Sequence, residues 1–384
     1  MENINRIEQT YRKLVAAGKP ILKLYSGNPT EAGFRFPPQI LEEVYFKYFQ
    51  TQSYEPHPKG LLKARQAIQQ YYKDGEVEVD AENIILTSGS SESFLYLFSL
   101  LAQPGDNILT PNPSYPLFNP IAEMVKVELR HYSLSEENNW EIDLSDLQNK
   151  TDAHTKAIIL VSPNNPTGAV HSIEEISNVV AWANQNNIAL ICDEVFSEFY
   201  FGEGKYPRPA AIAKPQLCFT LNGISKMFAL PSLKLSWIAV TGDAGKVASA
   251  VDLLETMADT FLTCHTPVQE VLPWLFFQAP AFLRSYREEV KRRRDLALNV
   301  LKNCLDISVI EPRGGFYLTG KIKKDLGLSE DEFVIGLMEA KGVFVHPGYF
   351  YDNEIGLHFV ISFLTKEEKL LEGVKSLVSF IEEQ

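Results

Sequence analysis

Four polar segments of the sequence carry residue types that could bind an anion and hold an amine. Gly89, Ser90 and Ser91 lie where an apolar run gives way to a helical pattern. Successive backbone N–H groups and the helix dipole would there face one point that suits an anion such as a phosphate. A serine that only caps the helix is the more common explanation of such a segment. Lys226 lies in the loop GISKM after another apolar run. A lysine in a partly desolvated pocket has a lowered pKa and can form a Schiff base with an aldehyde.

Two further polar side chains follow apolar runs of the same kind. Asn165, in SPNNPTG, can present an amide at the end of its strand, although a turn alone also explains this segment. Asp193 directly follows the run ALIC. A buried carboxylate at that position needs a cationic partner, which is either a salt bridge inside the protein or a charged ring nitrogen of a ligand.

The elements that must position these side chains are short apolar strands. Between about residues 78 and 241 such runs alternate with helical stretches, one of which begins near Ser91. Because the runs are mostly unbroken, they predict a largely parallel sheet that helices cover on both faces. Open sheets of this class bind ligands at their strand ends. The predicted strands are NIILT, NILTP, KVELR, KAIILVSP, IALICDE, QLCFTLN and LSWIAVT.

The C-terminal part of the sequence has a different pattern. A long helical stretch runs from about Pro267 to Asn303, and Pro273 and Pro280 could kink or divide it. The strand-like segments ISVIEP, FYLTG, GVFVHP and LHFVISFLT follow, with helices near 329–341 and from about residue 366. We therefore predict an α/β protein with a large domain at 46–268 and a smaller α+β domain formed by 1–45 and 269–384.

Composition excludes several classes of protein. The 384 residues contain 36 Lys and Arg against 49 Asp and Glu, which gives a net charge of −13 and disfavours nucleic acid and anionic membranes as partners. The one basic run, residues 291–294, has helical spacing, and we expect a solvated helix face. The sequence contains no GxGxxG, GxxxxGK[ST], HExxH or GxSxG motif. Dinucleotide, P-loop, zincin and serine-hydrolase sites therefore lose their main support.

Compartment and metal content follow from the cysteines and the N-terminal residues. The four cysteines are scattered without a CxxC pair, so we expect a reducing compartment and no metal site. The first twenty residues lack the apolar segment of a secretory signal, and no apolar run approaches 18 residues. We therefore expect a cytoplasmic protein.

Taken in order along the chain, the anion-binding turn, the amide, the carboxylate and the loop lysine describe a site for pyridoxal 5'-phosphate (PLP). The sequence resembles the class I and II aminotransferases, which are fold-type-I PLP enzymes, over nearly its whole length. The resemblance implies that Tyr115 of PNPSYP stacks on the PLP ring and that Asn165 bonds the ring hydroxyl. It also implies that Asp193 pairs with the ring nitrogen and that Lys226 forms the Schiff base.

The phosphate end of the cofactor is covered by the same resemblance. The family's phosphate-binding turn and flanking side chains correspond here to Gly89, Ser90, Ser91, Ser225 and Lys234. Tyr54, six residues before Gly60, resembles the tyrosine that reaches the phosphate of the neighbouring subunit. The resemblance therefore implies a homodimer.

Three positions depart from the family pattern. Lys234 replaces an arginine, which keeps the charge but loses the bidentate geometry. Phe196 replaces a tyrosine that donates to the ring hydroxyl. Val360 of LHFVISFLT replaces the arginine that grips the substrate carboxylate. Arg35 is the better candidate for a substitute cation, with a surface arginine as the alternative. His358 shares the face of Val360, but a core histidine explains it more simply.

The resemblance implies amino transfer between an amino acid or amine and a 2-oxo acid. The alternatives keep PLP but change the outcome to decarboxylation, β-elimination or oxidation. A PLP-binding regulator without turnover is the third possibility, although no basic helix-turn-helix precedes the first strand.

Overall fold

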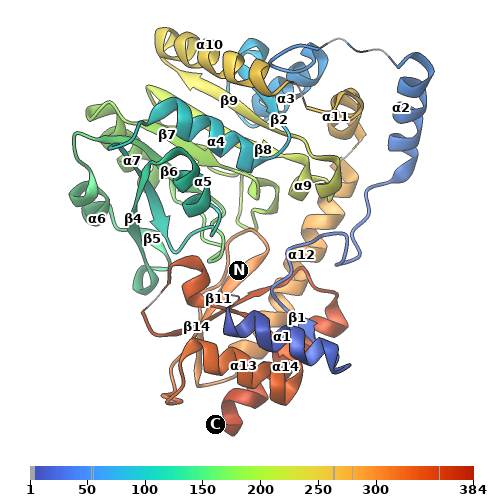
Figure 1. Cartoon of the computed structure of the whole chain (residues 1–384), viewed down its shortest axis with the longest axis vertical. Helices are drawn as coiled ribbons and strands as arrows, with labels where there is room; N and C mark the ends of the chain where they lie inside the picture. The colour runs from blue at the N-terminus through green and yellow to red at the C-terminus, as the bar shows by residue number, and fades with distance from the viewer. Residues whose placement is uncertain (1–4, 53, 55, 263, 279, 354) are drawn as a thin grey trace.

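The computed structural model describes residues 5–52, 54, 56–262, 264–278, 280–353 and 355–384. Figure 1 shows a large sheet with its helices above a smaller group of strands and helices, with α12 running between the two. The helices are α1 Arg6–Ala16, α2 Pro38–Thr51, α3 Leu62–Asp74, α4 Ser90–Leu101, α5 Phe118–Val125, α6 Leu144–Lys150, α7 Ile173–Gln185, α8 Pro209–Ile212, α9 Ile224–Met227, α10 Ala244–Phe261, α11 Thr266–Gln278, α12 Pro280–Leu301, α13 Glu330–Lys341 and α14 Glu367–Glu383.

The large sheet has eight strands in the order β2-β9-β8-β7-β6-β3-β4-β5. Strands β8, β7, β6, β3 and β4 are parallel to one another, whereas β9 and β5 pair antiparallel with their neighbours. The carboxyl ends of β6, β7 and β8 therefore lie along one edge. The strands are β2 Ile84–Thr87, β3 Asn107–Asn112, β4 Glu128–Ser135, β5 Glu141–Ile142, β6 Thr155–Val161, β7 Ala189–Asp193, β8 Leu217–Gly223 and β9 Ser236–Gly242.

Helices cover both faces of this sheet, which explains the unbroken apolar runs of its strands. Ile85 packs with α4, α5 and α10 on one face. Its neighbours Ile84 and Leu86 pack with α2, α3 and α11 on the other face. This alternation follows from the two-residue period of a strand. Further along the second face, α6 and α7 cover β6 and β7.

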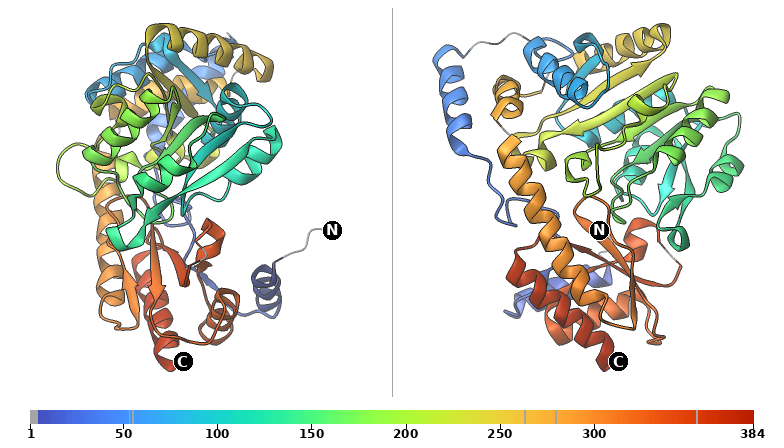
Figure 2. Two further views of the ribbon diagram at one scale, coloured as in Figure 1. Left: turned by 90° about the vertical axis from the view of Figure 1, so that its left-hand side faces the viewer. Right: turned by 180° about the vertical axis from the view of Figure 1, so that it is seen from behind.

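The smaller part of the molecule is built on short strands. A four-stranded antiparallel sheet has the order β10-β11-β14-β13, and β1 pairs with β12 in a separate parallel pair. Helix α1 lies beside α13, as Figure 1 and Figure 2 show. The strands are β1 Leu22–Lys23, β10 Ile307–Val309, β11 Tyr317–Ile322, β12 Val343–Phe344, β13 His346–Pro347 and β14 Leu357–Ser362.

The structure confirms the fold class and corrects several elements. The stretch expected from Pro267 to Asn303 is divided into two helices, as its prolines allowed, because α12 begins at Pro280, whereas Pro273 lies inside α11. Strand β4 begins at Glu128 and continues to Ser135, beyond the predicted KVELR. GVFVHP supplies two short strands that belong to different sheets. The N-terminal segment is divided, because α1 and β1 join the small part whereas Val44 of α2 packs beneath the large sheet. The domain boundaries at 45 and 268 stay a proposal.

The basic run at residues 291–294 is not a solvated face throughout. Arg293 and Arg294 on α12 are buried. One Nη of Arg293 donates to the carbonyl oxygen of Leu364 (2.6 Å), and one of Arg294 donates to that of Pro312 (2.6 Å). These acceptors lie far away in the sequence, so the prediction of a solvated face was wrong for these two residues. Among the described residues, no helix is long and apolar enough to span a membrane.

Candidate active site

A cavity of about 320 Å³ lies at the carboxyl ends of β6, β7 and β8, where Val161, Asp193 and Gly223 end their strands. It is lined by every residue that the resemblance assigned to the cofactor, apart from Tyr54, which was assigned to the site of the neighbouring subunit. These are Gly89, Ser90, Ser91, Tyr115, Asn165, Asp193, Ser225, Lys226 and Lys234. Parallel strands bring their carboxyl ends to one edge, so residues more than 100 positions apart meet there.

The end of the cavity near α4 has the form of an anion site. Gly89 is the N-cap of this helix, and no side chain caps its first turn. A Cβ atom at Gly89 would lie 3.1 Å from the Nζ atom of Lys234. The absence of a side chain at Gly89 therefore leaves room between the helix N-terminus and an ammonium group. Both groups favour an anion, and a phosphate fits this chemistry.

Asp193 and Asn165 line the cavity, and neither has its full set of hydrogen-bonding or charged partners. The Oδ1 atom of Asp193 accepts a hydrogen bond from the backbone N–H of Val195 (3.1 Å). Burial raises the pKa of Asp193 to about 6, and no ion pair to it occurs in the described part of the chain. The Oδ1 atom of Asn165 is buried and lacks a hydrogen-bond partner there. A protonated ring nitrogen would give Asp193 the cation that it lacks.

The neighbouring carboxylate does have a protein partner. Glu194 is buried next to Asp193 and forms an ion pair with the guanidinium group of Arg208. Arg208 also donates to the hydroxyl of Tyr71 (2.7 Å). The sequence left open whether Asp193 forms a salt bridge inside the protein. In the structure Glu194, and not Asp193, forms that salt bridge.

Lys226 lies in the short helix α9, directly after β8. Its Nζ atom donates to the carbonyl oxygen of Gly27 (3.2 Å) and lies 5.9 Å from the ring centre of Phe196. Burial lowers the pKa of Lys226 to about 8. A larger share of this amine is therefore neutral near pH 8 than in an ordinary lysine, which makes it a better nucleophile.

Aromatic side chains close the cavity. Tyr115 follows β3 and packs edge-on against Phe118, with ring centres 5.7 Å apart. Tyr317 of β11 also lines the cavity, and a Cβ atom at Gly27 would overlap its hydroxyl. Sequence reasoning missed Tyr317 and the carbonyl of Gly27. FYLTG was recognised as a strand, but its pattern does not tell which residue reaches the other sheet.

Three predicted residues lie outside this cavity. Tyr54 is 62% exposed. Arg35 is exposed and donates to the carbonyl oxygens of Thr30 and Phe34 within its own loop. His358 is fully buried, and its Nε2 atom lies 3.3 Å from both carboxylate oxygens of Glu136. Within one chain, the structure does not bring these three side chains to Lys226.

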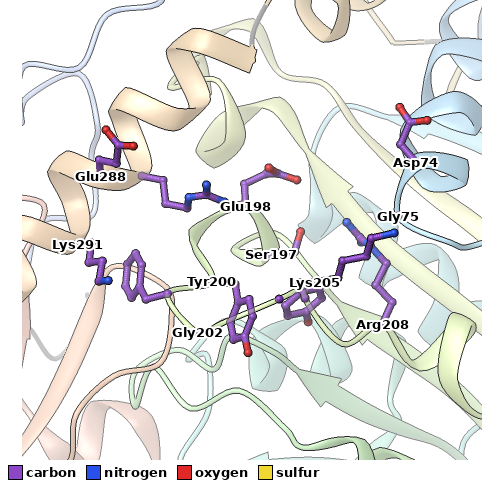
Figure 3. Close-up of a pocket in the computed structure, with 14 residues that line it drawn as sticks. Asp74, Gly75, Ser197, Glu198, Tyr200, Gly202, Lys205, Arg208, Glu288 and Lys291 are labelled. Atoms are coloured by element: carbon purple, nitrogen blue, oxygen red, sulfur yellow. The ribbon is translucent and has the colours of Figure 1, made fainter.

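A second cavity, of about 460 Å³, is lined by residues of α12 and of the segment that follows β7 (Figure 3). Glu288 and Lys291 of α12 line one side, and Arg208 lies on the other. It contains none of the predicted site residues, and Arg208 is already paired with Glu194. Among the described residues, no group of three or more His, Cys, Asp or Glu side chains could hold a metal ion.

Comparison with known proteins agrees with this geometry. Residues 19–377 match the family described as aminotransferase class I and II. The chain belongs to the class I and II aminotransferases. As a member of this family it is a PLP-dependent aminotransferase of fold type I, and amino acids and 2-oxo acids are the substrates of the family.

Individual relatives of this aminotransferase cover nearly the whole chain. It is 30% identical over 378 residues to glutamate-pyruvate aminotransferase AlaA of Haemophilus influenzae, covering 96% of this chain and 92% of the relative. It is 28% identical to alanine aminotransferase of Mycobacterium tuberculosis, with 98% and 89% covered. The solved alanine aminotransferase of Pyrococcus furiosus superimposes with a TM-score of 0.92 at 27% identity, covering 98% and 96%.

The residues of the cavity fit PLP. Bound PLP supplies an aldehyde for the substrate amine and a protonated ring that withdraws electrons from the reacting carbon. The space at Gly89 suits its phosphate, Asp193 suits its ring nitrogen, and the unpartnered amide of Asn165 suits its ring hydroxyl.

Proposed function

We propose that this chain transfers an amino group from a small donor to a 2-oxo acid, with Lys226 as the catalytic residue. The observation that carries the proposal is one cavity in which a lysine of lowered pKa, a buried carboxylate without a protein cation and an anion site lie together. Lys226 would bond the PLP aldehyde, give way to the substrate amine, and then move the proton at its Nζ atom.

The other cavity residues would hold the cofactor in place. The carboxylate of Asp193 would keep the ring nitrogen protonated, because an opposite charge favours the charged form. Tyr115 would place a flat face against the ring at little cost in entropy. Lys234, Ser225 and the turn Gly89–Ser91 would hold the phosphate. Phe196 supplies no hydroxyl, so we expect the ring hydroxyl to have one donor fewer than a tyrosine would provide.

The names of the relatives suggest which substrates to test first. Glutamate, alanine and pyruvate are the compounds that those names contain. The experiment incubates the PLP-loaded protein with pools of amino acids and primary amines, with pyruvate or 2-oxoglutarate as acceptor, and identifies products by mass spectrometry. We expect paired amine-to-ketone exchange. Release of CO₂, ammonia or hydrogen peroxide in place of exchange would contradict the proposal, as would no spectral response to any pool.

We also propose that the protein is a homodimer. Large apolar side chains are exposed on neighbouring helices at one end of the molecule. Lys47 of α2 lies 5.8 Å from the ring of Trp274 on α11, so the two helices are adjacent. The exposed side chains are Phe46, Phe49 and Tyr54 in and after α2, and Trp274 and Phe277 on α11. A second copy would bury this face and could bring its Tyr54 to the phosphate site.

Light scattering and mixed subunits test the dimer. We expect twice the monomer mass, and we expect the Phe49→Glu variant to shift toward monomers. Tyr54→Phe and Lys226→Ala subunits, each impaired alone, should recover activity when mixed, because one of the two sites then has both intact residues. Full activity of a monomeric variant would contradict the proposal.

We also propose that the protein is cytoplasmic. Its support is that Cys192 and Cys218 form no disulfide although their sulfur atoms are only 3.6 Å apart.

A further inference from the structure

The face of the small sheet that looks toward the cavity can be followed through its register. Tyr317 lines the cavity and pairs with Ser362, and the next pair on the same face is Thr319 with Val360. His346 of β13 lies opposite Val360 on the other side. Directly paired residues, and residues two apart on one strand, point to the same face of a sheet. Thr319, Val360 and His346 therefore continue the wall that begins with Tyr317, beyond the residues that line the cavity itself.

Contacts at both ends of this wall reach the large sheet. At one end, the backbone N–H of Ser114, next to Tyr115, donates to the carbonyl oxygen of Tyr351 (3.1 Å). At the other end, His358 contacts Glu136. The wall is thus enclosed between the two parts of the molecule, and Val360 is fully buried.

The groups at Thr319, Val360 and His346 are neutral, and Lys321, two residues beyond Thr319 on the same face, is already paired with Glu136 (3.3 Å). The hydroxyl of Tyr351 hydrogen-bonds the Nδ1 atom of His346 (3.0 Å), and the imidazole ring stacks on Tyr25 at 3.9 Å. Burial lowers the pKa of His346 to about 4, so its ring is uncharged near pH 7. Among the described residues that line the cavity, the cations are Lys226 and Lys234, and both have roles toward the cofactor.

Two hydroxyl groups on and near this wall have no partner. The Oγ1 atom of Thr319 and the Oγ atom of Ser114 are buried and form no hydrogen bond within the described part of the chain. Thr319 is only 4% exposed and Ser114 only 1%. A buried hydroxyl without a partner is costly, and a ligand that pairs with it recovers that cost. A carboxylate at the same place would be desolvated without a cation.

We propose that Thr319 and Val360 select an amino donor in which the carbon that carries the amine bears a neutral hydrogen-bonding group, such as an amide or a hydroxymethyl group, over a donor with a carboxylate there. This selection rests on the proposed function, because it concerns the donor of the same transfer.

The test uses four donors of one carbon skeleton: alanine, alaninamide, 2-aminopropan-1-ol and 2-aminopropane. Each is mixed with the PLP-loaded enzyme, and kcat/KM of the first half-reaction is measured from the cofactor absorbance. We expect the amide and the amino alcohol to exceed alanine at least tenfold. Val360→Arg should raise the value for alanine at least tenfold, since it supplies a carboxylate partner.

Thr319→Val is the second variant, because Val360→Arg could fail to fold. It has nearly the same shape and removes a hydroxyl that has no partner in the protein. We expect it to lower kcat/KM about tenfold for the amide and the amino alcohol and to leave 2-aminopropane unchanged. An equal loss for all four donors would show a merely structural role and overturn the inference.

Two further results are informative. A preference for alanine, or equal rates for alanine and the amide, would overturn the selection while leaving the transfer function in place. If neither these four donors nor the pools of the earlier experiment change the cofactor spectrum, then the proposed function itself fails, and the inference fails with it.

Discussion

Burial shifts the pKa values of Lys226 and Asp193, two residues that line the cavity, in the directions that favour their uncharged forms. The pKa of Lys226 falls and that of Asp193 rises, and in each case burial is the largest cause. Charging either residue is unfavourable in the cofactor-free protein, because each is buried without an opposite charge beside it. In the PLP-loaded protein, Lys226 would bond the aldehyde through its Nζ atom, and Asp193 would gain the protonated ring nitrogen as its cation.

The first prediction concerns covalent attachment. Borohydride reduction of the PLP-loaded protein should label Lys226, and Lys226→Ala should lose the label together with about 10²–10⁴-fold of activity, the range for a positioned acid–base group. Peptide mapping by mass spectrometry locates the label. Lys369→Ala changes an exposed lysine of α14 and serves as the control that keeps both properties. A label on another lysine of the wild type contradicts the assignment.

The second prediction is that Asp193→Asn stabilises the cofactor-free protein but lowers the activity of the PLP-loaded protein. In the cofactor-free protein, charging this carboxyl costs stability above pH 6, and the cost disappears as the pH falls toward its ordinary pKa of 3.8. The variant should therefore be about 1–3 kcal/mol more stable than the wild type at pH 8, with a smaller difference near pH 4. Denaturant titration measures this difference.

In the PLP-loaded protein the same change should be harmful. The ring nitrogen loses its counter-charge, so transfer should fall at least a hundredfold although PLP stays bound. Asp243→Asn alters an exposed carboxylate and should change neither quantity. Near-normal turnover of Asp193→Asn would refute the role of this residue.

At the scale of elements, the sequence predicted the strands that are buried on both faces better than any other feature. Residues 84–87, 189–193 and 217–223 are mostly apolar because helices cover both faces, and the last residues of the second and third of these strands, Asp193 and Gly223, line the cavity. Local pattern did not predict Tyr317 or Gly27, since their meeting depends on how the two sheets pack. It also failed for Arg293, whose acceptor carbonyl belongs to Leu364.

The third prediction concerns the turn between β2 and α4. Gly89→Ala should raise the dissociation constant of PLP at least tenfold, because its Cβ atom would occupy space beside Nζ of Lys234. The flexible lysine can move aside, so we expect the free energy of unfolding without PLP to change little. Equilibrium dialysis measures the affinity. Gly245→Ala in α10 is the matched control, because a Cβ atom there meets nothing within 4 Å.

At the scale of the whole molecule, the two sheets are joined by a charged contact. Glu136 lies in the 3-10 helix Glu136–Asn138 after β4 and reaches His358 and Lys321 of the small sheet, each at 3.3 Å. Burial alone would raise the pKa of Glu136, but hydrogen bonds and attraction from these two side chains outweigh it, so the pKa lies below its usual value. The contact therefore stabilises the folded protein above pH 4.5 and is lost as the pH falls further.

The fourth prediction follows from that contact. Glu136→Gln should lower the free energy of unfolding by about 1 kcal/mol at pH 7, the usual size of a hydrogen-bond contribution. The difference should shrink below pH 4, where the wild-type carboxyl is protonated as well. Glu137→Gln changes the exposed neighbouring carboxylate and should have no effect at either pH. A difference that does not depend on pH would contradict this explanation.

The pairing of β1 with β12 determines when the site is completed during synthesis. Leu22 pairs with Val343, and the segment that follows β1 ends in Gly27, whose carbonyl oxygen accepts from Lys226. A ribosome that adds roughly 5–20 residues per second makes these partner strands tens of seconds apart. Until Val343 has left the exit tunnel, we expect β1 to lack its partner strand and Lys226 to lack the covering carbonyl of Gly27. We therefore expect the active site to close only after the C-terminal segment has been translated.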